Sequence, residues 1–561
     1  MERRTFYLKA HWRFAGLAGL CAVLVSAVMQ LTLHAQAEAG ASDESVVVGT
    51  VIHPTAQINV GKAVLRTPEE MAQAEATLGP TATLDVPFMP TDAPSDYQAV
   101  KAIAQAKAAV AGREAGALAP PPPGPLVPPT LRGVSFDGAS QSGAFPPDTH
   151  GAVGLSHVVE VVNTSVVVFN KAGTLLKSTT LPAFFGSTEF IFDPRVVYDR
   201  DWRRWVIVAS RKSTSATDAV RRFFLATSTT SDPTGAYFIY TVSFGGGPFN
   251  AGDWWDYPGL GMDQDAVMVT GNIFDTPAGG FKFAAMMPMA KARLYNGLGF
   301  SVPVFTGLAA TLQPPIVLDQ NKDAYFVAAN NLTHLHLYRG ENLSNAFEAT
   351  LVLQALVDVP DYAIPPNAPQ LGTSQLLDTL DRRFVNASLQ VGDSLWNTHT
   401  INFVGFATPK FYQVDTEGTG VNTLKQNGFF FEGGTSHDFN ASIVANTSGE
   451  AFVTWTTTDV ANPTIALRHN ARIRFSGRQP ADALGSIPAG STLVTSATAL
   501  TGNPSTTPGV QRWGDYSAVS LDPSPGSTVG CTAQRRAWLV NEKINSSTVW
   551  GSRIARIGFC D

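Results

Sequence analysis

Most of the chain repeats one pattern of apolar and polar positions. From about residue 130 onward, short apolar runs alternate with turns rich in Gly, Pro, Asn and Asp. Each repeat has an apolar strand, a polar turn often opened by Asp or Asn, and a second strand rich in Val, Phe, Trp or Ala, which predicts antiparallel hairpins. The repeats start near residues 151, 195, 259, 315, 375, 442 and 518.

The spacing of these repeats predicts a β-propeller. The intervals, about 44 to 76 residues, can each hold four short strands with variable loops, which is what a propeller blade requires. We therefore predict an all-β, seven-bladed β-propeller over residues 131–561. The repeat near residue 375 is the weakest, so six or eight blades, or a pair of β-sandwiches, are the alternatives. The helical content of an α/β enzyme is missing from this part of the chain.

Residues 40–130 have a different composition. Two Ala-rich stretches, 67–79 and 95–119, have helical propensity, and the sequence PPPPGPLVPP at 120–129 is a stiff polyproline spacer. We predict an Ala/Pro-rich pro-segment or linker outside the propeller. A simple linker and an inhibitory pro-segment are the two interpretations.

The N-terminus predicts export. Basic residues between Arg3 and Arg13 precede an apolar run at 14–33, and small residues follow it. This pattern is typical of a signal peptide, here residues 1–39, and an uncleaved membrane anchor is the alternative. We expect a protein that is secreted, periplasmic or on the cell surface, with no stable membrane span once the signal is removed.

The composition of the chain limits the classes of binding partner that we expect. Net charge is −6 and charged residues are 15% of the chain, so there is no basic surface for nucleic acid. Beyond Cys21 in the apolar run, the chain contains Cys531 and Cys560, an even pair in an exported protein, and we expect a disulfide between them. We expect a monomer.

Aspartates recur at the start of the predicted inner strands. Inner strands of different blades converge on one mouth of the channel, so these aspartates are expected to form a ring. They are Asp148, Asp193, Asp256, Asp438 and Asp515. The alternative is that each caps backbone N–H groups and serves stability alone. A calcium ion held by several loops is physically reasonable, although no cofactor is required and no Asp-x-Asp-x-Asp-Gly loop occurs.

Two short stretches combine Trp with Asp-Tyr, at 253–259 and 512–516. The matching residues are Trp255, Asp256 and Tyr257 in the first stretch and Trp513, Asp515 and Tyr516 in the second. Aromatic rings beside carboxylates are what a sugar-binding site needs, because rings cover apolar sugar faces and carboxylates accept from hydroxyls. Aromatic wedges between adjacent blades are the alternative.

Basic side chains near these positions are further candidates. Arg195 and Arg512 lie within three residues of Asp193 and Asp515 in the sequence. Arg382 could bind a substrate carboxylate in bidentate fashion, and His399 could act as an acid or base near neutral pH.

Several of these motifs resemble a known group of proteins. PPDTHGAVG (146–154), FDPRVVYDRDWRRW (192–205), GDSLWNTHT (392–400) and RWGDYSAVSLD (512–522), with the terminal cysteine pair, are similar to secreted bacterial sialidase-like β-propeller proteins of the BNR/Asp-box-type superfamily. The resemblance implies architecture over residues 130–561 more strongly than activity. The chain departs from true sialidases, since it has neither a Ser-x-Asp-x-Gly-x-Thr-Trp box nor a Phe-Arg-Ile-Pro start.

These observations predict a propeller that binds an extracellular glycan or other acidic polymer at the mouth of its channel. Cleavage of that polymer is a further hypothesis. A sialidase-like glycoside hydrolase would use one of the carboxylates as its acid, whereas a polysaccharide lyase would use His399 or a tyrosine as its base. The alternative is a non-catalytic adhesion or scaffold propeller on the cell surface.

Overall fold

The computed structural model describes residues 47–78, 84–86, 88–92, 94–114, 126–141, 144–275, 279–329, 332–417, 423–502 and 507–561. The elements below belong to the compact unit Val51–Asp561. The predicted signal peptide, residues 1–39, lies outside the described residues, as does much of the proline-rich stretch.

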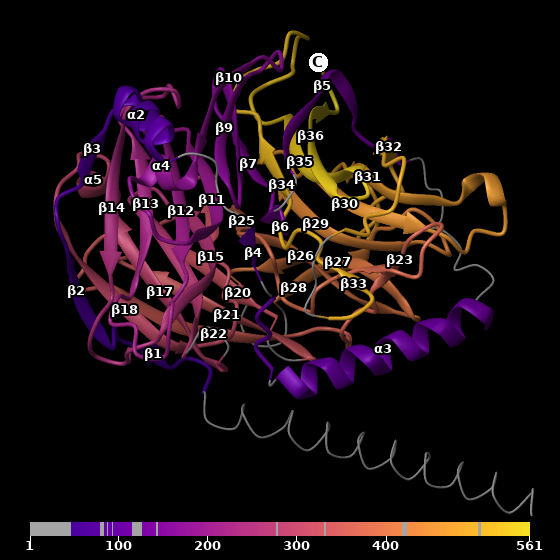
Figure 1. Ribbon diagram of the computed structural model, residues 1–561, viewed down its shortest axis with the longest axis horizontal. Helices are drawn as coiled ribbons and strands as arrows, with labels where there is room; N and C mark the ends of the chain where they lie inside the picture. Colours follow the sequence, from indigo (N-terminus) through magenta and orange to yellow (C-terminus); the bar gives the residue numbers. More distant parts are fainter. Residues whose placement is uncertain are drawn as a thin grey trace, which may run out of the picture. The chain divides into compact units, whose positions relative to one another are not determined.

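Antiparallel sheets follow one another along the chain, as the repeated strand–turn–strand pattern predicts (Figure 1). The first three consist of β7 (His150–Val153), β8 (His157–Val162), β9 (Ser165–Asn170) and β10 (Leu175–Thr180); β11 (Ile191–Asp199), β12 (Arg204–Arg211), β13 (Arg222–Ser228) and β14 (Tyr237–Ser243); and β15 (Trp254–Met262), β16 (Ala266–Phe274), β17 (Phe281–Ala290) and β18 (Phe300–Leu308).

The later sheets have the same order. They consist of β20 (Ala324–Ala328), β21 (His334–Glu341) and β22 (Thr350–Asp358); β25 (Ser388–Val391), β26 (Ser394–Phe403), β27 (Phe406–Asp415) and β28 (Leu424–Phe429); β29 (His437–Ala445), β30 (Ala451–Asp459), β31 (His469–Arg478) and β32 (Ser491–Thr495); and β34 (Ala518–Leu521), β35 (Arg536–Ser546) and β36 (Val549–Gly558). Strand β19 (Pro315–Val317) pairs in parallel with both β15 and β25.

The first strands of the sheets contact one another in a closed order. Strand β7 contacts β11, β11 contacts β15, β15 and β25 flank β19, β25 contacts β29, β29 contacts β34, and β34 contacts β7 again. Adjacent sheets also share apolar clusters, for example Val206 and Val208 of β12 with Val267 and Val269 of β16. A closed ring of short antiparallel sheets is the arrangement of a β-propeller.

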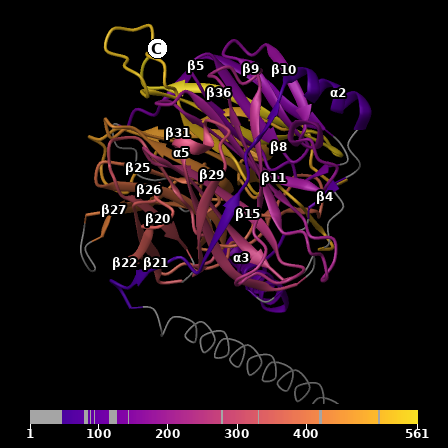
Figure 2. The ribbon, with the colours of Figure 1, turned by 90° about the vertical axis from the view of Figure 1, so that its left-hand side faces the viewer.

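Strand β5 (Thr130–Gln141) closes this ring. It pairs with β36, the last strand of the chain, from Thr130 opposite Gly558 to Gln141 opposite Trp550. The two strands lie side by side in Figures 1 and 2. The last sheet therefore contains both ends of residues 130–561.

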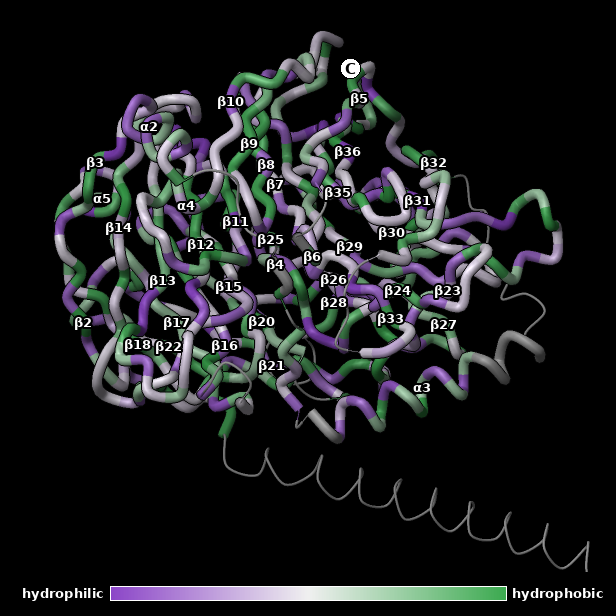
Figure 3. Tube along the Cα trace, in the orientation of Figure 1, coloured by the Kyte–Doolittle hydropathy of each residue, from purple (hydrophilic) through white to green (hydrophobic). Residues whose placement is uncertain are grey.

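The buried first strands position the site. Every residue of β11, β15 and β29 is buried, because each strand packs against its own sheet and against the first strands of the neighbouring sheets. These strands combine apolar residues with buried charged or polar ones, as in IFDPRVVYD of β11 and HDFNASIVA of β29, and Figure 3 shows hydrophobic stretches along the central strands.

Part of the predicted pro-segment belongs to the sheets. Strands β1 (Val51–Ile52), β2 (Ala56–Val60) and β3 (Val64–Arg66) add outer strands next to β22, β18 and β14. The boundary near residue 130 therefore does not separate this stretch from the propeller.

The remaining elements are short strands and helices. The strands are β4 (Leu84–Asp85), β6 (Ala144–Phe145), β23 (Ala368–Pro369), β24 (Leu376–Leu377) and β33 (Val510–Gln511), and the helices are α2 (Pro68–Leu78), α3 (Pro94–Glu114), α4 (Leu181–Phe185), α5 (Lys291–Leu294) and the 3-10 turn η1 (Ile465–Leu467). None of the described helices is both long enough and apolar enough to cross a membrane.

One sequence boundary needs correction. The sequence pattern predicts that the weak fifth repeat starts near residue 375, but the first strand of that sheet, β25, begins at Ser388. Residues 378–383 form a loop instead, which lies at the candidate site.

Candidate functional site

The predicted aspartates converge because the first strands run in the same direction around the ring. At the start of these strands, Asp148, Asp193, Tyr257, Thr311 and Asn440 have left-handed backbone conformations, with φ between 50° and 53°. Strands β11, β15 and β29 change register directly afterwards. A bulge at the same point of several strands redirects side chains toward the ring axis.

Asp148 and Asp515 are joined directly. The backbone N–H of Asp515 donates to Asp148 Oδ1 at 2.6 Å, and Asn163 Nδ2 donates to Asp148 Oδ2 at 2.6 Å. Asn163 also accepts the backbone N–H of Asp193 at 2.7 Å. Asn163 therefore connects the first two sheets directly, and through Asp148 it connects them with the last sheet.

Asp193 is paired with an aromatic side chain from the last sheet. The Tyr516 hydroxyl donates to Asp193 Oδ2 at 2.6 Å. The Arg195 guanidinium carbon lies 3.1 Å from the centroid of the Tyr516 ring. Arg195 itself donates to the backbone oxygens of Pro258 and Val385. The Tyr516 phenol, the Asp193 carboxyl and the Arg195 guanidinium are therefore adjacent.

Tyr257 completes this group. Its ring packs edge-on against Tyr516, with centroids 4.9 Å apart, and its hydroxyl donates to the Asp515 carbonyl oxygen at 3.4 Å. The Arg383 guanidinium carbon also lies over the Tyr257 ring, 4.6 Å from its centroid.

Two arginines form three ion pairs around the cluster. Arg512 donates to Asp378 at 3.1 Å and to Asp515 at 2.6 Å. Arg383 binds both oxygens of Asp381. All of these side chains are buried, so the charges are compensated inside the protein rather than by water.

Burial raises the pKa of four carboxyl groups in the cluster to about 7. They are Asp148, Asp193, Asp256 and Asp515. After burial, the charge of a neighbouring carboxylate raises the pKa of Asp148 and of Asp193 further, while Arg512 acts in the opposite direction on Asp515. Near neutral pH these groups can exchange protons, as acid–base chemistry requires. We call these four carboxyls with Arg195, Tyr257, Arg383, Arg512 and Tyr516 the carboxyl–arginine cluster.

A cavity of about 100 Å³ follows the axis of the ring. Its lining comes from the first strands, including His150, Val196, Ile316, Ser388 and Ser442. A smaller cavity of about 10 Å³ lies beside the cluster, next to Asp381, Arg383 and Gly514. The cluster thus lies at the end of the channel where the first strands begin.

Both predicted sugar-stacking tryptophans lie elsewhere. Trp255 is fully buried, packs against Phe223 and Phe244, and donates from Nε1 to the Thr270 carbonyl. Its neighbour Asp256 faces the other way because side chains alternate along a strand. Trp513 is 1% exposed and packs against Phe439. The structure supports packing between sheets for both rings.

Arg382 and His399 also lie outside the cluster. Arg382 binds both oxygens of Asp92, at 2.9 and 3.2 Å. His399 has both ring nitrogens engaged, Nδ1 with the Arg382 carbonyl at 2.6 Å and Nε2 with the Tyr412 hydroxyl at 3.0 Å. Burial lowers the pKa of His399 to about 3. The predicted acid–base role of His399 therefore lacks geometric support.

The Asp438 carboxylate stabilises the turn that precedes it in the chain. It accepts hydrogen bonds from Ser436 Oγ, Trp455 Nε1 and the Glu432 N–H. This is the capping role that was the alternative for each aspartate.

Sequence reasoning missed several members of this site. Asn163 holds the backbone of Asp193, and Asn272 holds that of Thr311 in the same way at 2.8 Å. The sequence contains a pattern that could have identified these two asparagines, because an Asn recurs near the end of the second strand in several repeats. Glu542, whose Oε2 accepts the Gly514 N–H at 2.7 Å, carried no such signal.

Calcium binding stays a prediction. Among the described residues, no group of three or more His, Cys, Asp or Glu side chains is arranged to hold a metal ion.

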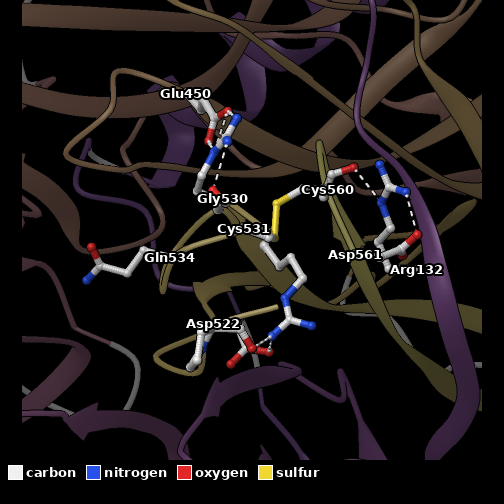
Figure 4. Close-up of a disulfide and its surroundings, with 12 residues drawn as sticks. Arg132, Glu450, Asp522, Gly530, Cys531, Gln534, Cys560 and Asp561 are labelled. Carbon is white, nitrogen blue, oxygen red and sulfur yellow. Dashed lines mark hydrogen bonds and ion pairs between the residues drawn. A yellow bond between two sulfur atoms is a disulfide. The ribbon is translucent and has the colours of Figure 1, made fainter. Parts of the chain in front are cut away.

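The predicted disulfide is confirmed between Cys531 and Cys560 (Figure 4). Arg132 of β5 lies nearby and donates to the Gly558 carbonyl, and it pairs with Asp561 at 3.2 Å. The disulfide and this arginine hold the end of the chain against the strand that closes the ring.

No family model and no curated protein sequence matches the chain. Among solved structures, it is similar to an exo-β-1,3-galactanase from Phanerochaete chrysosporium with galactose, at 11% identity and a TM-score of 0.30, over 77% of this chain and 96% of that one. A Trypanosoma rangeli sialidase matches at 10% identity and a TM-score of 0.33, over 76% and 60%. The parainfluenza virus 5 hemagglutinin-neuraminidase ectodomain matches at 10% identity and a TM-score of 0.31, over 84% and 97%. At such TM-scores the architecture rests on the strand order described above.

Proposed function

We propose that this chain is an exported, seven-bladed β-propeller that binds an extracellular glycan or other acidic polymer at the mouth of its central channel and hydrolyses it. The closed order of seven first strands, β7, β11, β15, β19, β25, β29 and β34, supports the blade number. The carboxyl–arginine cluster carries the function, because it combines acids that titrate near neutral pH with cations and phenols at the starts of the first strands, whose later residues line the cavity.

Each group in the cluster has a chemical role in this proposal. Asp256, whose pKa burial raises to about 7, supplies a proton to the leaving oxygen of the glycosidic bond. Tyr516 attacks the anomeric carbon as the glycosidic bond breaks, and Asp193 accepts the phenol proton along their 2.6 Å hydrogen bond. In the second step Asp256 takes a proton from water, which attacks the same carbon, and Asp193 returns its proton to the leaving Tyr516 oxygen, so that the sugar is released and the enzyme is restored. Arg195, above the Tyr516 ring, offsets the negative charge that develops there. A tyrosine nucleophile has precedent in glycoside hydrolysis.

Arginines give a preference for acidic polymers. Arg383 binds Asp381 in bidentate fashion, and Arg512 binds one oxygen each of Asp378 and Asp515. Both arginines suit the carboxylate of a uronic acid or another carboxylated sugar.

The test is a screen of the full chain against polysaccharides and fluorogenic glycosides between pH 5 and 8, with calcium and with a chelator. Release of reducing ends or fluorophore from an acidic or neutral glycan supports the proposal. The absence of both binding and turnover on every substrate would refute it.

The burial of the cluster favours a second candidate function. Every side chain of the cluster is at most 5% exposed, and most have partners within the protein. These features also fit a structural ion network in a non-catalytic adhesion or scaffold propeller. Variants of the cluster that lose stability in a protein without turnover would favour this second function.

A further inference from the structure

Helix α3 packs against the loop that borders the carboxyl–arginine cluster. Lys101 is 6% exposed, and its Nζ donates to the Leu380 carbonyl at 2.5 Å and to Thr379 Oγ1 at 3.0 Å. The same nitrogen lies 3.9 Å from the Asp378 carboxylate. Figure 1 shows α3 near the short strand β23, and the hydrogen bond from the Asn367 N–H, next to β23, to Gln105 Oε1 agrees with this placement.

The segment before the helix covers the arginines. The Phe88 ring lies 4.6 Å from the Arg383 guanidinium carbon and 5.6 Å from that of Arg512. The Met89 carbonyl accepts from Arg383 at 3.0 Å. Asp92 binds both terminal nitrogens of Arg382. Residues 88–92 therefore contact three arginines, Arg382, Arg383 and Arg512, on one side of the site.

These contacts are the ones that an acidic polymer would make. A bidentate carboxylate on an arginine and a flat ring against a guanidinium are specific, strong contacts for this side chain. Asp92 and Phe88 supply both from within the chain. The buried Lys101 adds a cation beside Asp378, which Arg512 also contacts. A ligand cannot reach Arg383 or Arg512 from this side while the segment is in place.

We propose that residues 88–92 and helix α3, together called the cap, are an intramolecular occupant of the arginine side of the site, and that an acidic polymer must displace the cap to bind. This inference rests on the proposed function for its ligand. The cap itself is defined by contacts within the chain, so the two can be tested separately.

The first readout needs no substrate. Phenylglyoxal modifies accessible guanidinium groups, and peptide mass spectrometry measures the modification of each arginine in the full chain. In Phe88→Ala/Lys101→Ala we expect Arg383 and Arg512 to react about tenfold faster than in the unaltered protein, because the cap opens locally more often. Lys107→Ala is the matched control, since Lys107 lies exposed on the same helix.

Labelling rates that equal those of Lys107→Ala would overturn the cap. If Arg195, which contacts Pro258 and Asn386 rather than the cap, also reacts faster, the propeller itself has opened. In that case Asp92→Asn decides, because it releases Arg382 alone: faster labelling of Arg382 supports the cap, and unchanged labelling overturns it.

The second readout is turnover on a substrate from the screen. Faster labelling with a severalfold lower KM in Phe88→Ala/Lys101→Ala supports both the cap and its ligand. Faster labelling without binding or turnover in any variant leaves the cap standing and refutes the proposed function.

Discussion

The Tyr516 hydroxyl donates a 2.6 Å hydrogen bond to Asp193, joining side chains 323 positions apart in the sequence. The bond links the last sheet of the ring to the second. Because Asp193 Oδ1 has no hydrogen-bond partner among the described residues, this phenol is the main support of the carboxyl side chain. The contact therefore serves closure of the ring and, in the proposed function, the chemistry.

Removal of this hydroxyl should affect activity more than stability. In Tyr516→Phe we expect turnover to fall by at least about 100-fold, because the nucleophile is gone, and the free energy of unfolding to fall by about 1–3 kcal/mol. Tyr240→Phe is the control, since it removes a buried hydroxyl that donates to the Leu294 carbonyl away from the site. Full turnover in Tyr516→Phe would exclude the tyrosine as nucleophile.

Asp193 should make stability depend on pH. Its folded-state pKa of about 7 lies above the ordinary value of 3.8, so the folded protein holds the proton more tightly. The contribution of Asp193 to stability is therefore fully present below about pH 4 and is lost as the pH rises through 7. His399 and His437, with pKa values lowered to about 3 and 4, act oppositely, because their contribution is lost as the pH falls below 6.5.

A comparison with Asp193→Asn isolates this effect, since the histidines are common to both proteins. We expect the unfolding free energy of the unaltered protein, relative to Asp193→Asn, to fall by about 1 kcal/mol per pH unit between pH 5 and 7. Chemical denaturation at each pH measures it. A difference that stays constant with pH would contradict the raised pKa.

His399 should behave as a structural residue. In His399→Ala we expect the free energy of unfolding to fall by about 2–4 kcal/mol, because two hydrogen bonds and ring contacts with Tyr362 and Phe384 are lost. Glycan binding should change by less than about twofold. Loss of turnover at unchanged stability would return His399 to the catalytic residues.

The disulfide should stabilise the chain end without affecting the site. Cys531 and Cys560 are 29 positions apart, so the chain-entropy model predicts a loss of about 3 kcal/mol in Cys531→Ser/Cys560→Ser. Thermal unfolding measures this loss, and glycan binding should be unaltered. An unchanged melting temperature would show that the pairing of β5 with β36 closes the ring unaided.

The convergence of Asp148, Asp193, Asp256 and Asp515 could be predicted from the sequence. Parallel first strands bring their starting residues to one end of the ring, whatever the loop lengths. The sequence pattern did not show that Trp255 lies buried against Phe223 and away from Asp256, which follows from the alternation of side chains along a strand.

Other parts of the site carried no pattern in the sequence. Residues 378–383 form an irregular loop, so periodicity could not place Arg383 or Asp381. The short strands β1 to β3 lie in a stretch where two to five residues per strand give too little alternation to detect. The contacts of Phe88 and Lys101 are tertiary, and helical propensity alone does not say what a helix covers.

The central claim is that the buried carboxyls act on a glycan, and Asp256→Asn tests it most directly. The control is Asp319→Asn, because Asp319 caps Asn321 at a turn that follows β19, beyond the far end of a first strand. Turnover of the glycan found in the screen and the melting temperature are measured for both variants. We predict that Asp256→Asn loses turnover by at least about 100-fold while its melting temperature stays within a few degrees of the unaltered protein; retained turnover, or a large fall in melting temperature in a protein that never turns over a glycan, would contradict the proposal.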